Sequence, residues 1–323
     1  MTNVEHIYPG YQWAEPLQGK ELDVQSIGSD LHITGLVPLY QRQDSPCDLV
    51  CQYEKSYKQL EIGQQRTGTQ WPDVRFANAD TDQKLIAFVR RFGPVVAKCV
   101  IDTSFVPDKE LGEPRFPCRL IAHQDMQELR NEQATYRAAL TLIMQLSQPN
   151  YDYVSAQLFM KTIAANIKDW PRQWEREESL GWGAPNWKLS AESLQRIEDL
   201  SSAPPDPILP DELSGRVVIC ELLNSFPSII FPNPFQMHSS IKFGIRPLLY
   251  SILRRQFIYP RGSAICTNTV CRNFFNIERA GQQFCSSECS LHHRQRVYWQ
   301  ERGNKLRTKR VAQRRKIKKK SRS

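Results

Sequence analysis

Several segments of the chain repeat apolar residues at the three- and four-residue spacing of an amphipathic helix. The first is residues 82–91, DQKLIAFVRR, which the pair Gly93-Pro94 ends. A second begins near Asp125, where Glu128 completes a capping-box-like start. Similar patterns predict further helices at 153–170, 189–200, 216–226 and 241–258. We therefore expect a largely helical protein.

Other segments interrupt this pattern. The short apolar run at 94–102, PVVAKCVID, is typical of a buried strand, and residues 31–40, LHITGLVPLY, mix apolar residues with Pro and Gly. The segment 201–215, SSAPPDPILPDELSG, is rich in proline and is typical of a linker. The predicted fold class is mainly α with some β near the N-terminus, an α+β protein.

These patterns divide the chain into three parts. Residues 1–256 form a mainly helical body, which the proline-rich segment 201–215 could subdivide. Residues 257–303 form a small module, and residues 304–323 form the end of a basic helix and a tail. We expect the tail to be disordered when it is free, because its like charges repel and none of them can be buried.

Cysteine content and hydropathy indicate the cellular compartment of the protein. The chain has nine cysteines, its first residues lack the basic-then-apolar pattern of a signal peptide, and no run approaches 18 consecutive apolar residues. An odd number of cysteines in a large chain favours a reducing compartment, where cysteines close together in the sequence more often bind metal than form disulfides. The sequence thus predicts a cytoplasmic protein without a membrane partner.

The positive charge is concentrated at one end. Of 43 basic and 34 acidic residues, 14 basic residues and a single acid, Glu301, lie in residues 290–323. The rest of the chain holds 29 basic and 33 acidic residues and is slightly acidic. Such asymmetry predicts a terminus that binds a polyanion.

Four cysteines precede this basic end in two pairs. Cys266 and Cys271 are separated by four residues, Cys285 and Cys289 by three, and 13 residues lie between the pairs. Two short pairs from separate turns can supply the four thiolates of a tetrahedral, structural Zn²⁺ site. Ordinary buried thiols and a disulfide pair are the alternatives. Because four thiolates leave no open coordination position, we expect the zinc to be structural.

The residues between the pairs predict a hairpin. RNFFNIE at 272–278 and QQFC at 282–285 alternate apolar and polar residues, and Gly281 between them can adopt a positive φ. The predicted apolar core is then very small: Phe274, Phe275 and Phe284. A core of this size needs a metal to hold it.

The second cysteine pair is predicted to open a helix. Ser286 is a good N-cap, Glu288 favours the first turn, and Cys289 would lie inside that turn. A knuckle, a hairpin and a helix with ligands at its start form a treble-clef arrangement. His292 and His293 follow closely, so either could replace a cysteine as ligand or contact a phosphate instead.

The helix that follows is strongly basic. Tyr298 and Trp299 interrupt its charge, and one of them could stack on a base or sugar. The predicted nucleic-acid contacts are Arg294, Arg296, Arg302, Lys305, Arg307, Lys309, Arg310, Arg314, Arg315 and Lys316. Charge alone does not separate DNA from RNA. A solvating tail and an anionic membrane surface are the alternative interpretations.

The C-terminal segment resembles the zinc module of bacterial CGNR-type zinc-finger proteins. The matching features are the four cysteines, Phe274-Phe275, the FCS at 284–286 and the basic residues beyond; GIRPLLYSILRRQFI and KLIAFVRRFGPV also resemble their N-terminal region. The resemblance implies a helical body with a DNA-binding zinc finger, in a transcriptional regulator. In place of Gly-Asn-Arg this chain has Ser290-Leu291-His292, so a role of that motif in reading bases does not transfer.

The predicted function is therefore a zinc-containing nucleic-acid-binding protein, with DNA as the expected partner and RNA as the alternative. No phosphate-binding glycine loop, nucleophile elbow or HExxH motif is present, so we expect no enzymatic activity. Two other functions stay open: a protein-interaction module whose tail docks on an acidic partner, and an enzyme that processes nucleic acid with a site in the body. The body itself would sense a ligand, form a homodimer or contact another protein, and DNA binding would place the protein at the nucleoid.

Overall fold

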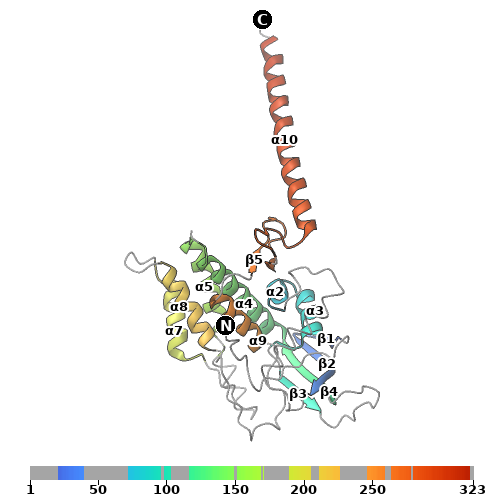
Figure 1. The fold of residues 1–323 in the computed structure, drawn as a ribbon, viewed down its shortest axis with the longest axis vertical. Coiled ribbons are helices and arrows are strands. Elements are labelled where there is room, and N and C mark those ends of the chain that lie inside the picture. The colour runs from blue at the N-terminus through green and yellow to red at the C-terminus, as the bar shows by residue number, and fades with distance from the viewer. Residues whose placement is uncertain are drawn as a thin grey trace. The chain divides into compact units, whose positions relative to one another are not determined.

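The computed structural model describes most of the chain. The residues it describes are 21–39, 72–95, 98–102, 116–148, 151–168, 170, 189–204, 211–225, 246–258, 263–277 and 279–320. They fall into two compact units that divide between Gly262 and Ser263 (Figure 1). We call the described residues up to Ile258 the body and those from Ser263 onward the C-terminal module.

The body contains a four-stranded antiparallel sheet. Its strand order is β1-β2-β4-β3, so the two long strands lie at the centre. The strands are β1 (Asp23–Ile27), β2 (Asp30–Leu39), β3 (Lys98–Asp102) and β4 (Phe116–Asp125). A hairpin through Gly28, whose φ is +64°, joins β1 to β2.

One face of this sheet packs on the core. Val24 is opposite Ile33, and Ile33 is opposite Ala122, in the register of the three neighbouring strands. All three side chains are buried, as is Leu31, two residues before Ile33 on β2. Because alternate residues of a strand point to the same face, these side chains mark the face that is covered.

The described helices of the body are arranged around a central one, α4 (Figure 1). α4 packs against α2, α3, α5, α8 and α9, and it directly follows β4 of the sheet. The helices are α2 (Pro72–Ala77), α3 (Asp82–Phe92), α4 (Met126–Leu146), α5 (Tyr153–Ile167), α7 (Ala191–Ser202), α8 (Asp211–Asn224) and α9 (Arg246–Ile258).

Short polar side chains start several of these helices. Asp125 accepts a hydrogen bond from the backbone N–H of Glu128 at 2.7 Å, and Ser190 accepts one from Ser193 at 3.0 Å. Gly93, with a φ of +91°, ends α3 by donating its N–H to the Val89 carbonyl. The predicted start at Asp125 and the predicted stop at Gly93 are confirmed.

Aromatic rings form the centre of the helical core. Tyr136 of α4 is fully buried, with its ring 5.6 Å from that of Phe76 and 5.8 Å from that of Tyr250. Its hydroxyl donates a hydrogen bond to the Leu249 carbonyl at 3.2 Å. Trp170 also packs against Tyr250, with 6.3 Å between ring centroids. These rings join α2, α4 and α9, which are far apart in the sequence.

A buried ion pair lies beside this aromatic cluster. Arg246 of α9 donates from Nε to Glu132 Oε1 of α4 at 3.0 Å, and both side chains are almost fully buried. The guanidinium also lies over the Trp170 ring, 4.1 Å from its centroid. Burial raises the pKa of Glu132, while the charge of Arg246 and hydrogen bonds from Tyr250 and Arg246 lower it; burial outweighs them.

A second buried acid, Asp73, lies on α2. It is 1% exposed, and one carboxylate oxygen accepts a hydrogen bond from Gln256 Nε2 at 2.8 Å. Its other oxygen, Oδ1, is buried without a hydrogen-bond partner among the described residues. Burial raises the pKa of Asp73 to about 6 despite hydrogen bonds that oppose the shift.

The structure is mainly helical with a small β-sheet, as predicted, but it departs from the sequence-based prediction in two places. The strand predicted at 94–102 is β3, whose described part begins at Lys98, and β1, β2 and β4 were not predicted as strands. Helices α7 and α8 extend into both ends of the segment predicted as a linker, 201–215. In the described part of the chain the last helix of the body, α9, ends at Ile258, and the C-terminal module begins at Ser263.

The C-terminal module contains two short strands and one long helix. β5 (Ser263–Ile265) pairs antiparallel with β6 (Phe274–Asn276), and α10 (Ser287–Lys320) follows. α10 is 34 residues long and passes through Gly303 without a break. It also includes Lys316–Lys320, for which charge repulsion predicts disorder. Within the part of the chain that is described, no helix is both long and apolar enough to span a membrane.

Candidate metal centre

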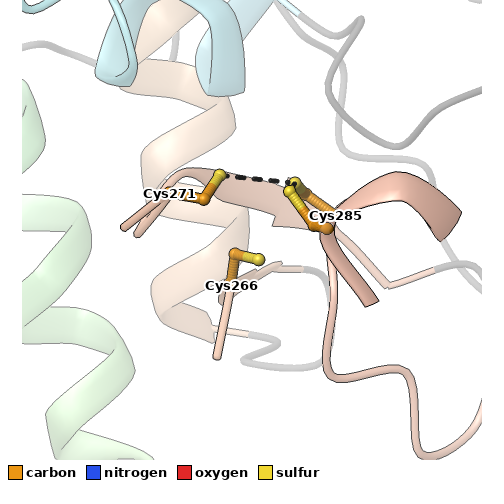
Figure 2. A group of neighbouring side chains, drawn as sticks. Cys266, Cys271 and Cys285 are labelled. Carbon is orange, nitrogen blue, oxygen red and sulfur yellow. Dashed lines mark hydrogen bonds between the residues drawn. The ribbon is translucent and has the colours of Figure 1, made fainter. Parts of the chain in front are cut away.

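Four cysteines of the C-terminal module form one cluster. The sulfur atoms of Cys266, Cys271, Cys285 and Cys289 all lie within 4.8 Å of one another, and none is in a disulfide. Figure 2 shows the side chains of Cys271 and Cys285 directed toward each other. The structure therefore brings together the four residues that the spacing singles out.

The distances between the sulfurs fit a shared metal ion better than a disulfide. Cys271 Sγ lies 3.6 Å from Cys285 Sγ, which lies 3.4 Å from Cys289 Sγ. A disulfide bond is about 2.0 Å long. Four thiolates at about 2.3 Å around a tetrahedral Zn²⁺ are about 3.8 Å apart. The four sulfurs are thus close to the geometry of a closed four-thiolate site, and they could hold a metal ion.

The first cysteine pair lies on a turn that Asn268 organises. The carbonyl of Asn268 accepts hydrogen bonds from the backbone N–H groups of Cys271 at 2.9 Å and Arg272 at 3.0 Å. Its side-chain oxygen accepts from the Val270 N–H at 3.3 Å, while its amide donates to the Cys289 carbonyl at 3.4 Å. This buried residue joins both cysteine pairs. Sequence reasoning missed it, although an Asn two residues after a ligand is a recognisable turn signal.

The predicted hairpin pairing is wrong. Strand β6, which includes Phe274 and Phe275, pairs with β5 before the first cysteine, not with residues 282–285. A single backbone hydrogen bond, from Thr267 N–H to the Gln283 carbonyl at 2.9 Å, joins the segment around Gln283 to the first turn. The predicted positive φ of Gly281 is confirmed at +75°. The strands therefore flank the first cysteine pair, because Cys266 directly follows β5.

The second pair lies at the start of α10, as predicted. Ser286 is the N-cap: its hydroxyl accepts a hydrogen bond from the Cys289 N–H at 3.1 Å. Glu288 lies in the first turn. Cys289 thus lies at the positive end of the helix dipole, which favours a thiolate. Cys285 precedes the helix and Cys289 belongs to its first turn, so a metal ion held by the cluster would fix where the helix begins.

The thiols differ in how readily they lose a proton. Burial raises the pKa of Cys271 and raises that of Cys285 much further. Burial also acts against ionisation of Cys289, but hydrogen bonds from Ser286, Cys285 and Cys271 outweigh it and lower its pKa. A thiolate at Cys289 next to crowded, buried thiols is an arrangement that a divalent cation would stabilise.

The apolar core around the cluster is very small. Its buried residues are Cys266, Phe275 and Cys285. Phe284 is partly buried and packs against them. Phe274 is also buried, and it points to the opposite side of β6 from Phe275. Two of these three buried residues, Cys266 and Cys285, are candidate metal ligands. This core is too small to hold a fold by apolar burial alone.

The two histidines lie beside the cluster. The ring of His293 packs 5.2 Å from that of Phe284, and His292 Nε2 lies 3.9 Å from Glu288 Oε1 on the preceding turn. Neither belongs to the group of close ligand atoms found among the described residues, which comprises the four cysteines. The geometry thus supplies four ligands without either histidine.

Helix α10 carries the predicted nucleic-acid contacts. Arg294, Arg302, Lys309 and Arg310 are exposed. Arg296 donates a hydrogen bond to Thr269 Oγ1 at 2.8 Å, so it also ties the helix to the first cysteine turn. Lys305, Arg307, Arg314, Arg315 and Lys316 belong to α10, but their side chains lie outside the part that the structure describes.

Comparison with known proteins identifies no relative of this chain. No protein-family model, curated protein or solved structure has a significant match to this chain. The functional argument therefore depends on the residues themselves.

Proposed function

We propose that the C-terminal module is a treble-clef-like zinc finger whose structural four-cysteine site positions α10 for binding to nucleic acid. The observation that carries the proposal is the cluster of four cysteine sulfurs, within 4.8 Å of one another, at the start of a 34-residue basic helix. Zn²⁺ suits four thiolates in a tetrahedral arrangement, and such a closed site has a structural role.

The charge of α10 supports nucleic acid as the class of partner. Residues 290–323 hold 14 basic residues against one acid, and the described basic side chains Arg294, Arg302, Lys309 and Arg310 are exposed. Lys and Arg on an exposed helix neutralise phosphates and release counterions, which produces binding that falls steeply with salt. DNA is the proposed partner, and a role in regulating transcription follows from the resemblance to CGNR-type proteins.

The direct test is the salt dependence of nucleic-acid binding by the full-length chain. The variant is Lys309→Gln/Arg310→Gln, which removes two exposed charges from α10. On duplex DNA each lost phosphate contact should reduce the slope of log affinity against log salt by about 0.9, so the pair reduces it by up to about 1.8. Fluorescence anisotropy between about 50 and 200 mM salt measures the slope.

The matched control removes the same two kinds of charge from the body. Lys84→Gln/Arg130→Gln affects exposed residues that pair with Asp80 and Asp82. This control should leave the slope unchanged. Equal losses in both variants would show that net charge and not α10 determines binding. Absence of any salt-sensitive binding to DNA or RNA by the unmodified protein would overturn the proposal.

A further inference from the structure

An exposed aromatic pair lies in the middle of the basic helix. Trp299 is 62% exposed and Tyr298 54% exposed, and their ring centroids are 5.6 Å apart in an edge-to-face arrangement. Large aromatic side chains on a charged, solvated helix are unusual unless a partner covers them, since their exposure costs free energy. Their place between the exposed Arg294 and Lys309 favours a partner that carries negative charge.

Arg302 holds these two rings in position. Its guanidinium lies 5.5 Å from the centroid of the Trp299 ring, and its Nη1 donates to the Tyr298 hydroxyl at 3.3 Å. Arg302 lies one helical turn beyond the pair, as residues three and four apart on a helix are neighbours. These contacts restrict the positions of the rings without a ligand, and such restriction lowers the entropy cost of stacking on them.

We propose, as an extension of the proposed function, that Trp299 with Arg302 is a stacking platform for an unpaired base, so that α10 prefers single-stranded nucleic acid. A base inside a duplex has both faces covered by its neighbours, whereas a base in a single strand can stack on an indole. Stacking of this kind tolerates any sequence, because every base has a π face.

The charges on the same face of α10 complete the site. Positions 299, 302, 306, 309 and 310 share one side of the helix by its 3.6-residue period. Arg302 lies next to the indole, and Lys309 and Arg310 lie about 10 Å farther along the helix axis. The backbone of a strand whose base stacks on Trp299 can thus follow a row of exposed basic side chains. This combination of aromatic platform and basic track is how proteins bind single strands.

The test compares full-length Trp299→Ala with the unmodified protein. A labelled single strand of about 20 nucleotides, longer than the site size of typical single-strand binders, and a duplex of the same sequence are titrated by fluorescence anisotropy at several salt concentrations. We expect the variant to bind the single strand about 5- to 150-fold more weakly, and the duplex with less than about a twofold change. The salt slope should not change, because no charge is removed.

Two further variants keep the result interpretable. Trp299→Phe should retain most of the single-strand affinity, because it keeps a ring face. Leu306→Ala removes an apolar side chain, 50% exposed, from the same face and should have no effect. Equal binding by Trp299→Ala and the unmodified protein, or equal losses on both ligands, would overturn this inference while leaving salt-dependent binding by α10 intact. Failure of the unmodified protein to bind either ligand would instead overturn the proposed function.

Discussion

In the body, Tyr136 is fully buried among Phe76, Tyr250 and the helices α2, α4 and α9, whereas in the C-terminal module the buried cluster consists of Phe275 and two cysteines. The body can be held by apolar burial across its sheet and helices. The module has too little apolar surface for that. The difference predicts that the proposed metal site, and not apolar burial, holds the module, so removal of the metal ion should unfold the module and leave the body folded.

The largest expected effect comes from removing two ligands. Cys285→Ser/Cys289→Ser should abolish metal binding and lose the folding free energy it supplies, about 10–16 kcal/mol for a structural zinc site. Hydrogen exchange should then show rapid exchange in residues 263–290, while the amides of α4 and the sheet stay protected. Cys220→Ser, at an exposed thiol of the body, is the control and should change neither region. Protection retained in the module of the double variant would contradict a metal-dependent fold.

The next effect tests how the body tolerates buried charge. Arg246→Met leaves Glu132 buried without its cation and should destabilise the protein by about 3–5 kcal/mol at neutral pH. The loss should shrink as the pH falls, since protonation removes the unpaired negative charge of Glu132. Urea unfolding of the variant and the unmodified protein at about pH 5 and about pH 8 measures the destabilisation and its change with pH.

The exposed pair Lys84–Asp80 supplies the comparison for that variant. Lys84→Met breaks an ion pair of 2.6 Å between half-exposed side chains and should cost less than about 1 kcal/mol. A similar cost for both substitutions would show that burial of the Arg246–Glu132 pair has no special consequence. The metal content of the module should stay the same in both.

Substitution of Asp73 should have a smaller effect on the free energy of unfolding, and it should stabilise the body where Arg246→Met destabilises it. Its folded-state pKa of about 6 is above the ordinary 3.8, so the folded protein holds the proton more tightly than the unfolded chain. Stability should therefore fall as the pH rises from about 4 to 6, by on the order of 3 kcal/mol, and stay lower above that. Asp73→Asn should remove this loss and stabilise the body at neutral pH, as measured by urea unfolding.

Asp82 is the opposite case and serves as the control. Arg130 lowers the pKa of this exposed carboxylate by hydrogen bonds and charge, so its contribution is present at neutral pH and is lost as the pH falls. Asp82→Asn should give no stabilisation at neutral pH. If Asp73→Asn behaves in the same way, burial is not what raises the Asp73 pKa.

The smallest effect concerns the start of α10. Ser286→Ala removes the hydroxyl that accepts the Cys289 N–H and should destabilise the module by about 1 kcal/mol. The consequence should be a several-fold weaker zinc affinity in competition with a chelator, with one ion still bound. Ser193→Ala, on a helix of the body, should leave the affinity unchanged. An unaltered affinity in Ser286→Ala would mean that the cap does not support the ligand turn.

The two regions also differ in how far their sequences predict them. The four cysteines, the N-cap Ser286 and the turn at Gly281 are local features of one short segment, and the structure confirms that the cysteines cluster, that Ser286 caps α10 and that Gly281 has a positive φ. Strand pairing was predicted wrongly even there, because alternation in RNFFNIE does not identify the partner strand. In the body, capped helices were predictable, whereas β4 was missed.

The reasons for these misses are physical. β4 contains Pro117, Arg119 and Gln124, and its pairing with β2 joins segments that are far apart in the chain, so no local pattern marks it. The buried Asp73 and the Glu132–Arg246 pair are charged residues that a hydropathy pattern assigns to the surface. Only the packing of α2, α4 and α9 reveals them.

The most direct measurement of the central claim is the metal content of the purified full-length protein. Elemental analysis should find one zinc ion per chain, and a mercurial reagent that reacts with the cysteines should release that ion as the four clustered thiols are modified. Cys266→Ser/Cys285→Ser should contain none. A metal-free native protein with its module folded, or the same zinc content in that double variant, would contradict the account.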